Sequence, residues 1–488
     1  MDPDIEQDKE EKKYTSKIKR KLNLFFFFIG IINHLGTTLV LTGGRILAKE
    51  LNMYDYLYFY TSASTICNII TRLVNSRYLV HVPYKKRVIF LVFWMGGGYF
   101  LMYLILTGHE KKIIEGNKAN VIFFLLSFIP SLILGSSYAL GESAIIAYLN
   151  KFPKKLVGGF SSGTGLSGLI SASLNLSTQL IKDFKIKNLY LYLSAIGILY
   201  FYFFYLTEKV YEEVNGPKEK IGALLIEESN NSNENIIDDL NKSEVEDNEK
   251  NLLKSKNDTD KNKPMSFENI KHVLKCVGRI IFNLFFIYFT QFYTLNGLLI
   301  RIMDRIDVHL LPIQCSKSEN GLYERKGKYE FMCLFFQIGM FAAKSMLFIA
   351  KKIKPIEILS GTIFGILIFY IFEYFYHFTD YYIFFPIILI LGFTAGSTYV
   401  AAFYNILSNE NLGEEYKDVA VNCATIANDT GTFLCGIIGY ITMDTIFKER
   451  TLYIEYVKNN TLLSPNNCCN NKTLPCPYPN SSLFFLLN

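Results

Sequence analysis

Long apolar runs separated by short polar segments fill the chain from residue 22 to residue 446. Because about 20 helical residues cross the hydrocarbon core of a bilayer, each run is long enough to be a transmembrane helix. The runs predict eleven spans, at residues 22–46, 56–80, 87–107, 120–149, 157–181, 188–207, 272–300, 328–350, 355–377, 382–407 and 418–446. We therefore expect an all-α polytopic membrane protein.

Residues 208–271 interrupt this pattern. They are nearly free of aromatic residues after Tyr211 and rich in Asn, Glu, Asp, Lys and Ser, so they have too little apolar surface to offset the entropy of ordering. The pattern predicts a disordered cytosolic linker between a six-helix bundle, 22–207, and a five-helix bundle, 272–446. Two bundles joined in this way are typical of transporters whose halves move about a central site, as in the MFS-like fold. Leu252 and Leu253 follow several acids and loosely resemble a sorting signal, which would recruit trafficking partners; otherwise they are plain linker.

Composition and charge agree with membrane insertion and suggest a topology. Half of the 488 residues are hydrophobic and only 19% are charged, too apolar for a soluble chain. The basic tail 1–21 is expected in the cytosol by the positive-inside rule, with the N-terminus. Basic residues of three further loops fall on the same side: Arg77, Lys85, Lys86, Arg87, Lys151, Lys154, Lys155, Lys351, Lys352 and Lys354. The loops after spans 3 and 10 depart from the rule. An odd number of spans places the tail 447–488 in the lumen.

Nine cysteines divide according to this topology. Five lie in or beside spans, where a thiol behaves as a small hydrophobe. The other four are expected outside the cytosol, where an oxidising lumen would allow two disulfides in any of three pairings: Cys315, Cys468, Cys469 and Cys476. A zinc site is the weaker alternative, because the tail contains no His. Sequons at Asn459, Asn471 and Asn480 agree with a lumenal, glycosylated tail, although similar sequons occur in the linker.

Two carboxylates inside apolar runs are the first functional candidates. Glu142 lies in span 4, and the next span opens with the hydroxyl residues Ser161, Ser162 and Thr164; Asp429 lies in span 11. A charge at membrane depth costs roughly 2.5–3.5 kcal/mol on insertion scales, so it normally faces a partner or a water-filled cavity. One acid in each bundle could bind and release protons during transport. The alternative is that each is a structural hydrogen-bonding group.

Other polar residues within the spans are further candidates: Asn405 ranks with the two acids, and His34 and Lys344 are secondary candidates. Asn405 could bond to a solute or to a neighbouring helix. His34 lies in the middle of span 1, and imidazole titrates close to physiological pH; it is either a sensor or a packed neutral side chain. Lys344, Arg45, Arg301 and Glu373 lie near span ends and are expected to extend toward the membrane surface.

No pattern of an enzyme occurs in the sequence. There is no H-E-x-x-H, no phosphate-binding Walker loop and no nucleophile elbow, and the glycines at 163–165 have no preceding strand. We expect no catalytic activity, no cofactor, no metal site and no nucleic-acid partner.

Two stretches resemble the battenin family, the Batten-disease lysosomal membrane proteins. They are LGESAIIAYLNKFPKKLVGGFSSGTGLSGLI (140–170) and GSTYVAAFYNILSNENLGEEYKDVAVNCATIANDTGTFLCGIIG (396–439). HVPYKKRV (81–88) and YFTQFYTLNGLL (288–299) are weaker matches, and the second adds Gln291 and Asn296 to the candidate residues. Three features depart from the family pattern: Gln291 stands where Glu is frequent, Lys344 where Arg is frequent, and the chain ends without a prenylatable Cys.

The resemblance implies an MFS-like protein of the lysosomal or vacuolar membrane. Roles proposed for the family include organelle pH homeostasis, movement of basic amino acids and clearance of glycerophosphodiesters. We therefore expect a transporter of a small polar or cationic solute, coupled to protons, in contact with membrane lipid. The alternative is a non-transporting scaffold that acts in trafficking through the linker 208–271.

Overall fold

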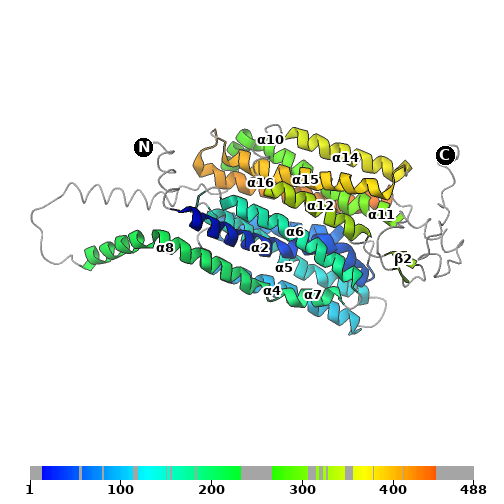
Figure 1. The fold of residues 1–488 in the computed structure, drawn as a ribbon, viewed down its shortest axis with the longest axis horizontal. Helices are drawn as coiled ribbons and strands as arrows, with labels where there is room; N and C mark the ends of the chain where they lie inside the picture. The colour runs from blue at the N-terminus through cyan, green and yellow to red at the C-terminus, as the bar shows by residue number, and fades with distance from the viewer. Residues whose placement is uncertain are drawn as a thin grey trace, which may run out of the picture.

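The computed structural model places a set of long helices side by side along one direction (Figure 1). It describes residues 14–53, 56, 58–79, 82–113, 119–149, 151–153, 156–181, 184–231, 266–305, 315–317, 323–325, 328–346, 356–376, 378–409 and 411–446. Every predicted span corresponds to a helix or to consecutive helical segments.

The N-terminal half consists of α2 (Ser16–Glu50), α3 (Tyr58–Arg77), α4 (Tyr84–Glu110), α5 (Ala119–Leu149), α6 (Val157–Leu180), α7 (Ile186–Leu193) and α8 (Ile196–Asn231). The C-terminal half consists of α10 (Phe267–Phe292), the π-helix η4 (Tyr293–Leu299), α11 (Ile300–Arg305), α12 (Lys328–Ser345), α14 (Glu357–Tyr376), α15 (Tyr381–Leu407) and α16 (Glu414–Thr445). Between α11 and α12, β1 (Cys315–Lys317) and β2 (Tyr323–Arg325) pair antiparallel, with Ser316 opposite Glu324.

The two halves pair their helices in the same order. In the first half α2 packs on α6, α3 on α5, and α4 on α5; in the second α10 packs on α16, α12 on α15, and α14 on α15. Helices α2, α3 and α4 of the first half thus correspond to α10, α12 and α14 of the second half. Such an internal repeat is the arrangement of an MFS-like fold. The predicted all-α, two-bundle fold is confirmed.

Glycines hold the paired helices close together in both halves. A Cβ atom at Gly163 would overlap the backbone carbonyl of Phe27, so α2 and α6 can approach only because this position has no side chain. Gly392 has the same relation to the carbonyl of Phe336, between α15 and α12. Small residues bring membrane helices together because packing, rather than hydrophobic burial, drives their association in lipid.

Four helices join the halves. The contacts between the halves are made mainly by α3 with α16 and by α6 with α12. Seven segments are long and apolar enough to cross a membrane on their own account: Ser16–Glu50, Tyr84–Glu110, Ala119–Leu149, Ile186–Val214, Phe267–Met303, Glu357–Tyr376 and Tyr381–Leu407. The four joining helices are absent from this set. Polar side chains of all four meet across the junction, Arg72 with Asp429 and Lys344 with Thr164, and a site is therefore to be sought between these helices.

The expected disordered linker is shorter than the sequence suggested. Helix α8 continues to Asn231 and extends beyond the bundle in Figure 1, while α10 begins at Phe267, where the Ser266 hydroxyl accepts a hydrogen bond from the Asn269 amide at 3.3 Å. Residues 208–231 contain many good helix formers, which the low aromatic content concealed. Residues 232–265 and the tail 447–488 lie outside the described residues.

Candidate functional site

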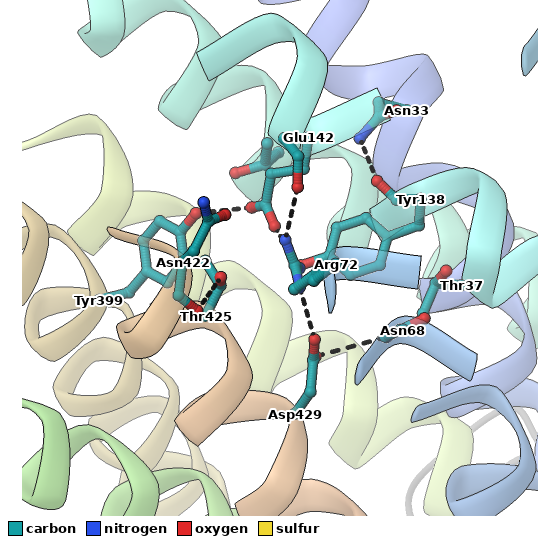
Figure 2. Close-up of polar contacts among 12 residues, drawn as sticks. Asn33, Thr37, Asn68, Arg72, Tyr138, Glu142, Tyr399, Asn422, Thr425 and Asp429 are labelled. Carbon is teal, nitrogen blue, oxygen red and sulfur yellow. Dashed lines mark hydrogen bonds and ion pairs between the residues drawn. The ribbon is translucent and has the colours of Figure 1, made fainter. Parts of the chain in front are cut away.

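A buried arginine connects the two halves. Arg72 of α3 is 1% exposed; its Nη2 donates to Oε2 of Glu142 at 2.6 Å and its Nε donates to Oδ2 of Asp429 at 2.7 Å (Figure 2). Glu142 belongs to α5 of the same half, whereas Asp429 belongs to α16 of the other half. Charges this deeply buried persist only when they are paired, and breaking such a pair from one side is strongly destabilising.

Tyrosines complete this group of charges. The hydroxyl of Tyr399, on α15, donates to Oε1 of Glu142 at 2.8 Å, a second contact between the halves. The ring of Tyr138 lies 5.4 Å from the guanidinium carbon of Arg72. We call Arg72, Glu142, Asp429 and Tyr399 the Arg72 cluster. It lies nearer to the end of the bundle where α3 finishes at Arg77, which we call the Arg77 end.

A cavity of about 90 Å³ adjoins the Arg72 cluster. Both halves line it, with residues that include His34, Thr164, Gln291, Asn296, Gln337, Lys344, Tyr399 and Asp429. Several polar atoms around it lack hydrogen-bond partners: both carboxamide atoms of Gln291, Oε1 of Gln337 and Nδ1 of His34. A cavity with such a lining suits a polar occupant.

Lys344 is the second buried cation at this cavity. Lys344 is only 4% exposed. Its Nζ lies 3.4 Å from the Thr164 hydroxyl and 4.6 Å from the ring centroid of Tyr399. The expectation that Lys344 extends to the membrane surface is wrong. Gly165 of α6 leaves room for the lysine side chain, because a Cβ atom at position 165 would lie only 3.2 Å from the Cβ atom of Lys344. Lys344 therefore lies across the junction of α12 and α6.

A second set of polar contacts joins the halves toward the opposite end. Arg45 of α2 pairs with Glu330 of α12 at 3.4 Å. Asn296 of η4 donates to the Thr61 hydroxyl at 3.1 Å and accepts from the Tyr329 hydroxyl at 3.0 Å. We call these five residues the Asn296 network. Asn296 itself lies in a π-helical turn, a form that is frequent at functional sites. Arg45 is thus engaged with the other half instead of the membrane surface.

The structure brings many of the predicted candidates together. Glu142 and Asp429 are buried and face a partner, as expected, and the partner of both is Arg72. Thr164, Gln291, Asn296, His34 and Lys344 line the cavity. Ser161, Ser162 and Asn405 do not belong to its lining. Glu373 is 1% exposed within α14, so it also does not extend to the surface.

Sequence reasoning missed Arg72. It lies five residues before Arg77, and basic residues near the end of a span were assigned to the membrane surface. A signal was present, since two carboxylates inside apolar runs require buried cations, and Arg72 stands among polar residues of a span. Treating the acids and the span arginines as one set would have found it.

The predicted disulfides lie outside what the structure describes: Cys468, Cys469 and Cys476 belong to the tail, and of Cys315 only the backbone, in β1, is described. The five cysteines in or beside spans are free thiols: Cys67, Cys276, Cys333, Cys423 and Cys435.

Comparison with known proteins gives consistent relatives. The sequence profile of the family described as CLN3 protein matches residues 24–448. Battenin of Dictyostelium discoideum is 22% identical over 440 residues, covering 86% of this chain and 94% of that protein. Protein BTN1 of Debaryomyces hansenii is 20% identical over 418 residues, covering 85% and 91%. Among solved structures, a POT family transporter in complex with 5-aminolevulinic acid aligns over 90% of this chain and 95% of that chain, with 14% identity and a TM-score of 0.48.

Proposed function

Because this chain belongs to the CLN3 protein family, with its membrane helices arranged as two repeated halves, we propose that it is a proton-coupled transporter that moves a small polar solute across a lysosomal or vacuolar membrane by alternating access. The observation that carries the proposal is the position of Arg72. A buried cation shared between carboxylates of both halves, beside a cavity that both halves line, is suited to a contact that forms and breaks as the halves move.

The Arg72 cluster supplies the gate at the Arg77 end. Its ion pair with Glu142 lies within one half, so it survives a rocking motion. The contacts of Arg72 with Asp429 and of Tyr399 with Glu142 cross between the halves, so both break when this end opens. Arg72 then keeps one carboxylate partner in the open state and is never a lone buried charge.

The Asn296 network supplies the gate at the other end. Its contacts from Arg45 to Glu330 and from Asn296 to Thr61 also cross between the halves. With both gates formed, contacts between the halves restrict both ends of the cavity, and a bound solute leaves when one set of contacts opens. By the positive-inside argument the Arg77 end faces the cytosol.

Proton coupling follows from two carboxylates sharing one arginine. Arg72 and Lys344 carry two positive charges, and Glu142 and Asp429 carry two negative charges, so the four are balanced. A proton on Asp429 would weaken its contact across the halves, while Glu142 would still compensate Arg72. Protonation would thereby favour opening at the Arg77 end, as a local charge change that biases a two-state element.

The test is to measure the distance between the halves at both ends. Spin labels on Tyr78 and Asn411 report the Arg77 end, and labels on Ile113 and Phe378 report the other end; all four side chains are exposed. We expect Asp429→Asn to lengthen the first distance and leave or shorten the second, measured by pulsed electron resonance in lipid nanodiscs. If both distances stay fixed across pH and in Asp429→Asn, alternating access is contradicted.

Deleting residues 232–265 separates this function from a scaffold that acts through the linker. A transporter should keep solute uptake in proteoliposomes after the deletion, whereas a scaffold should lose its whole function. Metabolite profiling of organelles from cells that lack the protein would provide the solutes to assay, with basic amino acids and glycerophosphodiesters as the first classes.

A further inference from the structure

Resting on the proposed function, we propose that Lys344 is the binding group for an oxyanion of the solute, a phosphate or a carboxylate, and that Tyr399 transmits occupancy of this subsite to the Arg72 cluster. The proposal follows from a comparison of the buried cations that the structure describes, from the geometry around Lys344, and from the position of Tyr399 between the two sites.

Lys344 differs from the other cations between the halves in its partners. Arg72 binds two carboxylates and Arg45 binds Glu330, whereas no carboxylate of the described residues forms an ion pair with Lys344. An isolated ammonium group out of water is costly unless it is paired. Lys344 lines the cavity, so an anion that enters the cavity can supply the missing partner.

The surroundings of Lys344 leave it free to bind such a group. An ammonium has three N–H donors, and the contacts of Nζ are the Thr164 hydroxyl and the face of the Tyr399 ring. Thr164 uses its own proton on the carbonyl of Ser161 at 2.8 Å, so toward Lys344 it acts as an acceptor. Gln337 lies seven residues before Lys344, on the same face of α12, and its Oε1 has no partner. The remainder of a solute can bond there and at Gln291.

The sign of the subsite follows from charge. Asp429 also lines the cavity, but its Oδ2 is held by Nε of Arg72 at 2.7 Å. Among these groups, Lys344 is therefore the charged side chain that lines the cavity without a direct ion-pair partner among the described residues. A solute with only a cationic group would meet Lys344 as a like charge, whereas a zwitterion or an anion would not.

Tyr399 connects the subsite to the gate. Its ring lies against Nζ of Lys344 at 4.6 Å, and its hydroxyl donates to Glu142 at 2.8 Å, across the halves. An oxyanion that draws Lys344 toward the cavity changes the support of this ring, and with it the bond to Glu142. Tyr399 is thus a positioning residue, which acts through Glu142 and Lys344.

Equilibrium binding to purified full-length protein in nanodiscs tests the subsite. The probes are inorganic phosphate, glycerol 3-phosphate and acetate, with choline as the cationic comparison, and the readout is the ligand-dependent rise in Tm. We expect one of the anions, and not choline, to stabilise the wild type. Lys344→Gln should weaken its apparent affinity at least about tenfold, Lys344→Arg should retain most of it, and Lys185→Gln, an exposed lysine far from the cavity, should change nothing. Comparing phosphates with acetate identifies the oxyanion class.

Two results would overturn the subsite: no stabilisation of the wild type by any of the anions, or equal stabilisation of Lys344→Gln. Tyr399→Phe tests the connection, because it keeps the ring and removes the hydroxyl. The variant should bind the anion nearly as well as wild type, but anion binding should no longer change the distance between labels on Tyr78 and Asn411. If the anion changes this distance in the variant as much as it does in wild type, the connection is contradicted. If binding depends on Lys344 but the distances never change, alternating access fails and the subsite stands. If the halves move and transport does not depend on Lys344, the subsite fails and alternating access stands.

Discussion

The N-terminal and C-terminal halves pair their helices in the same way, yet they differ in how their buried charges are compensated. Arg72 and Glu142 form an ion pair within the first half. In the second half, Asp429 finds its cation in the first half, and Lys344 reaches Thr164 of the first half. The pair of Arg72 with Glu142 therefore stabilises the first half itself, whereas Asp429 and Lys344 stabilise the association of the second half with the first. Substitutions in the two halves should differ accordingly.

The largest effect is expected at Arg72, which serves both halves. Arg72→Gln leaves two carboxylates buried without a cation, and removing one side of a buried ion pair typically costs about 3–5 kcal/mol. We expect poor yield and a much lower Tm of the purified protein. The matched control is the triple variant Arg72→Gln with Glu142→Gln and Asp429→Asn, which removes the whole charged set and should recover most of the loss. If the Tm of Arg72→Gln equals that of wild type, Arg72 does not stabilise the two halves as we expect.

Substitutions of the two acids should have different effects, because Glu142 pairs within its own half and Asp429 pairs with the other half. Glu142→Gln weakens the ion pair inside the first half and should lower the free energy of unfolding by about 1.5–3 kcal/mol, the usual range for a hydrogen bond to a charged group. Asp429→Asn should cost less stability and should instead change the distance between Tyr78 and Asn411. In transport assays, both variants should lose pH-gradient-driven uptake while counterflow at equal pH survives. Equal effects of the two substitutions on Tm and on the distance would contradict the asymmetry of the halves.

The shared scaffold gives a prediction in which the halves should agree. Gly163→Val and Gly392→Val each place a side chain against a backbone carbonyl of the paired helix. Overpacking of this kind typically costs about 1–3 kcal/mol, and we expect similar losses in Tm at both positions. Gly365→Ala is the control, because a Cβ at Gly365 meets nothing within 4 Å. If only one of the two valine variants is destabilised, the helix pairs are not equivalent.

These comparisons also explain how much the sequence could predict. Helices at the eleven predicted positions were predictable because a largely apolar run of helical length has few alternatives, and the burial of Glu142 and Asp429 followed from their positions in such runs. The partners were not predictable one residue at a time. Arg72 is separated from Asp429 by 357 residues, and their meeting depends on how the halves pack. Lys344 near a span end reads as a surface residue until Gly165, on another helix, is seen to make room for it.

The smallest effect is expected at an exposed ion pair of the first half, which separates burial from charge. Glu110 contacts Lys185 at 2.7 Å and also Lys187, and the side chain of Lys185 is 59% exposed. The hydrogen bond to Glu110 raises the pKa of Lys185 above its ordinary value of 10.5. Because the folded pKa is the higher one, this contribution is complete below pH 10.5 and is lost as the pH rises through the raised value.

After solvent screening the exposed pair is worth at most about 1 kcal/mol, so Lys185→Gln should shift Tm only slightly. The shift should vanish at high salt, since exposed charges are screened within about one Debye length, whereas the loss in Arg72→Gln should remain. Thermal unfolding of both variants at low and high ionic strength makes the measurement. An equal salt dependence of the two would mean that the Arg72 cluster is reached by solvent ions, and the enclosed gate would have to be abandoned.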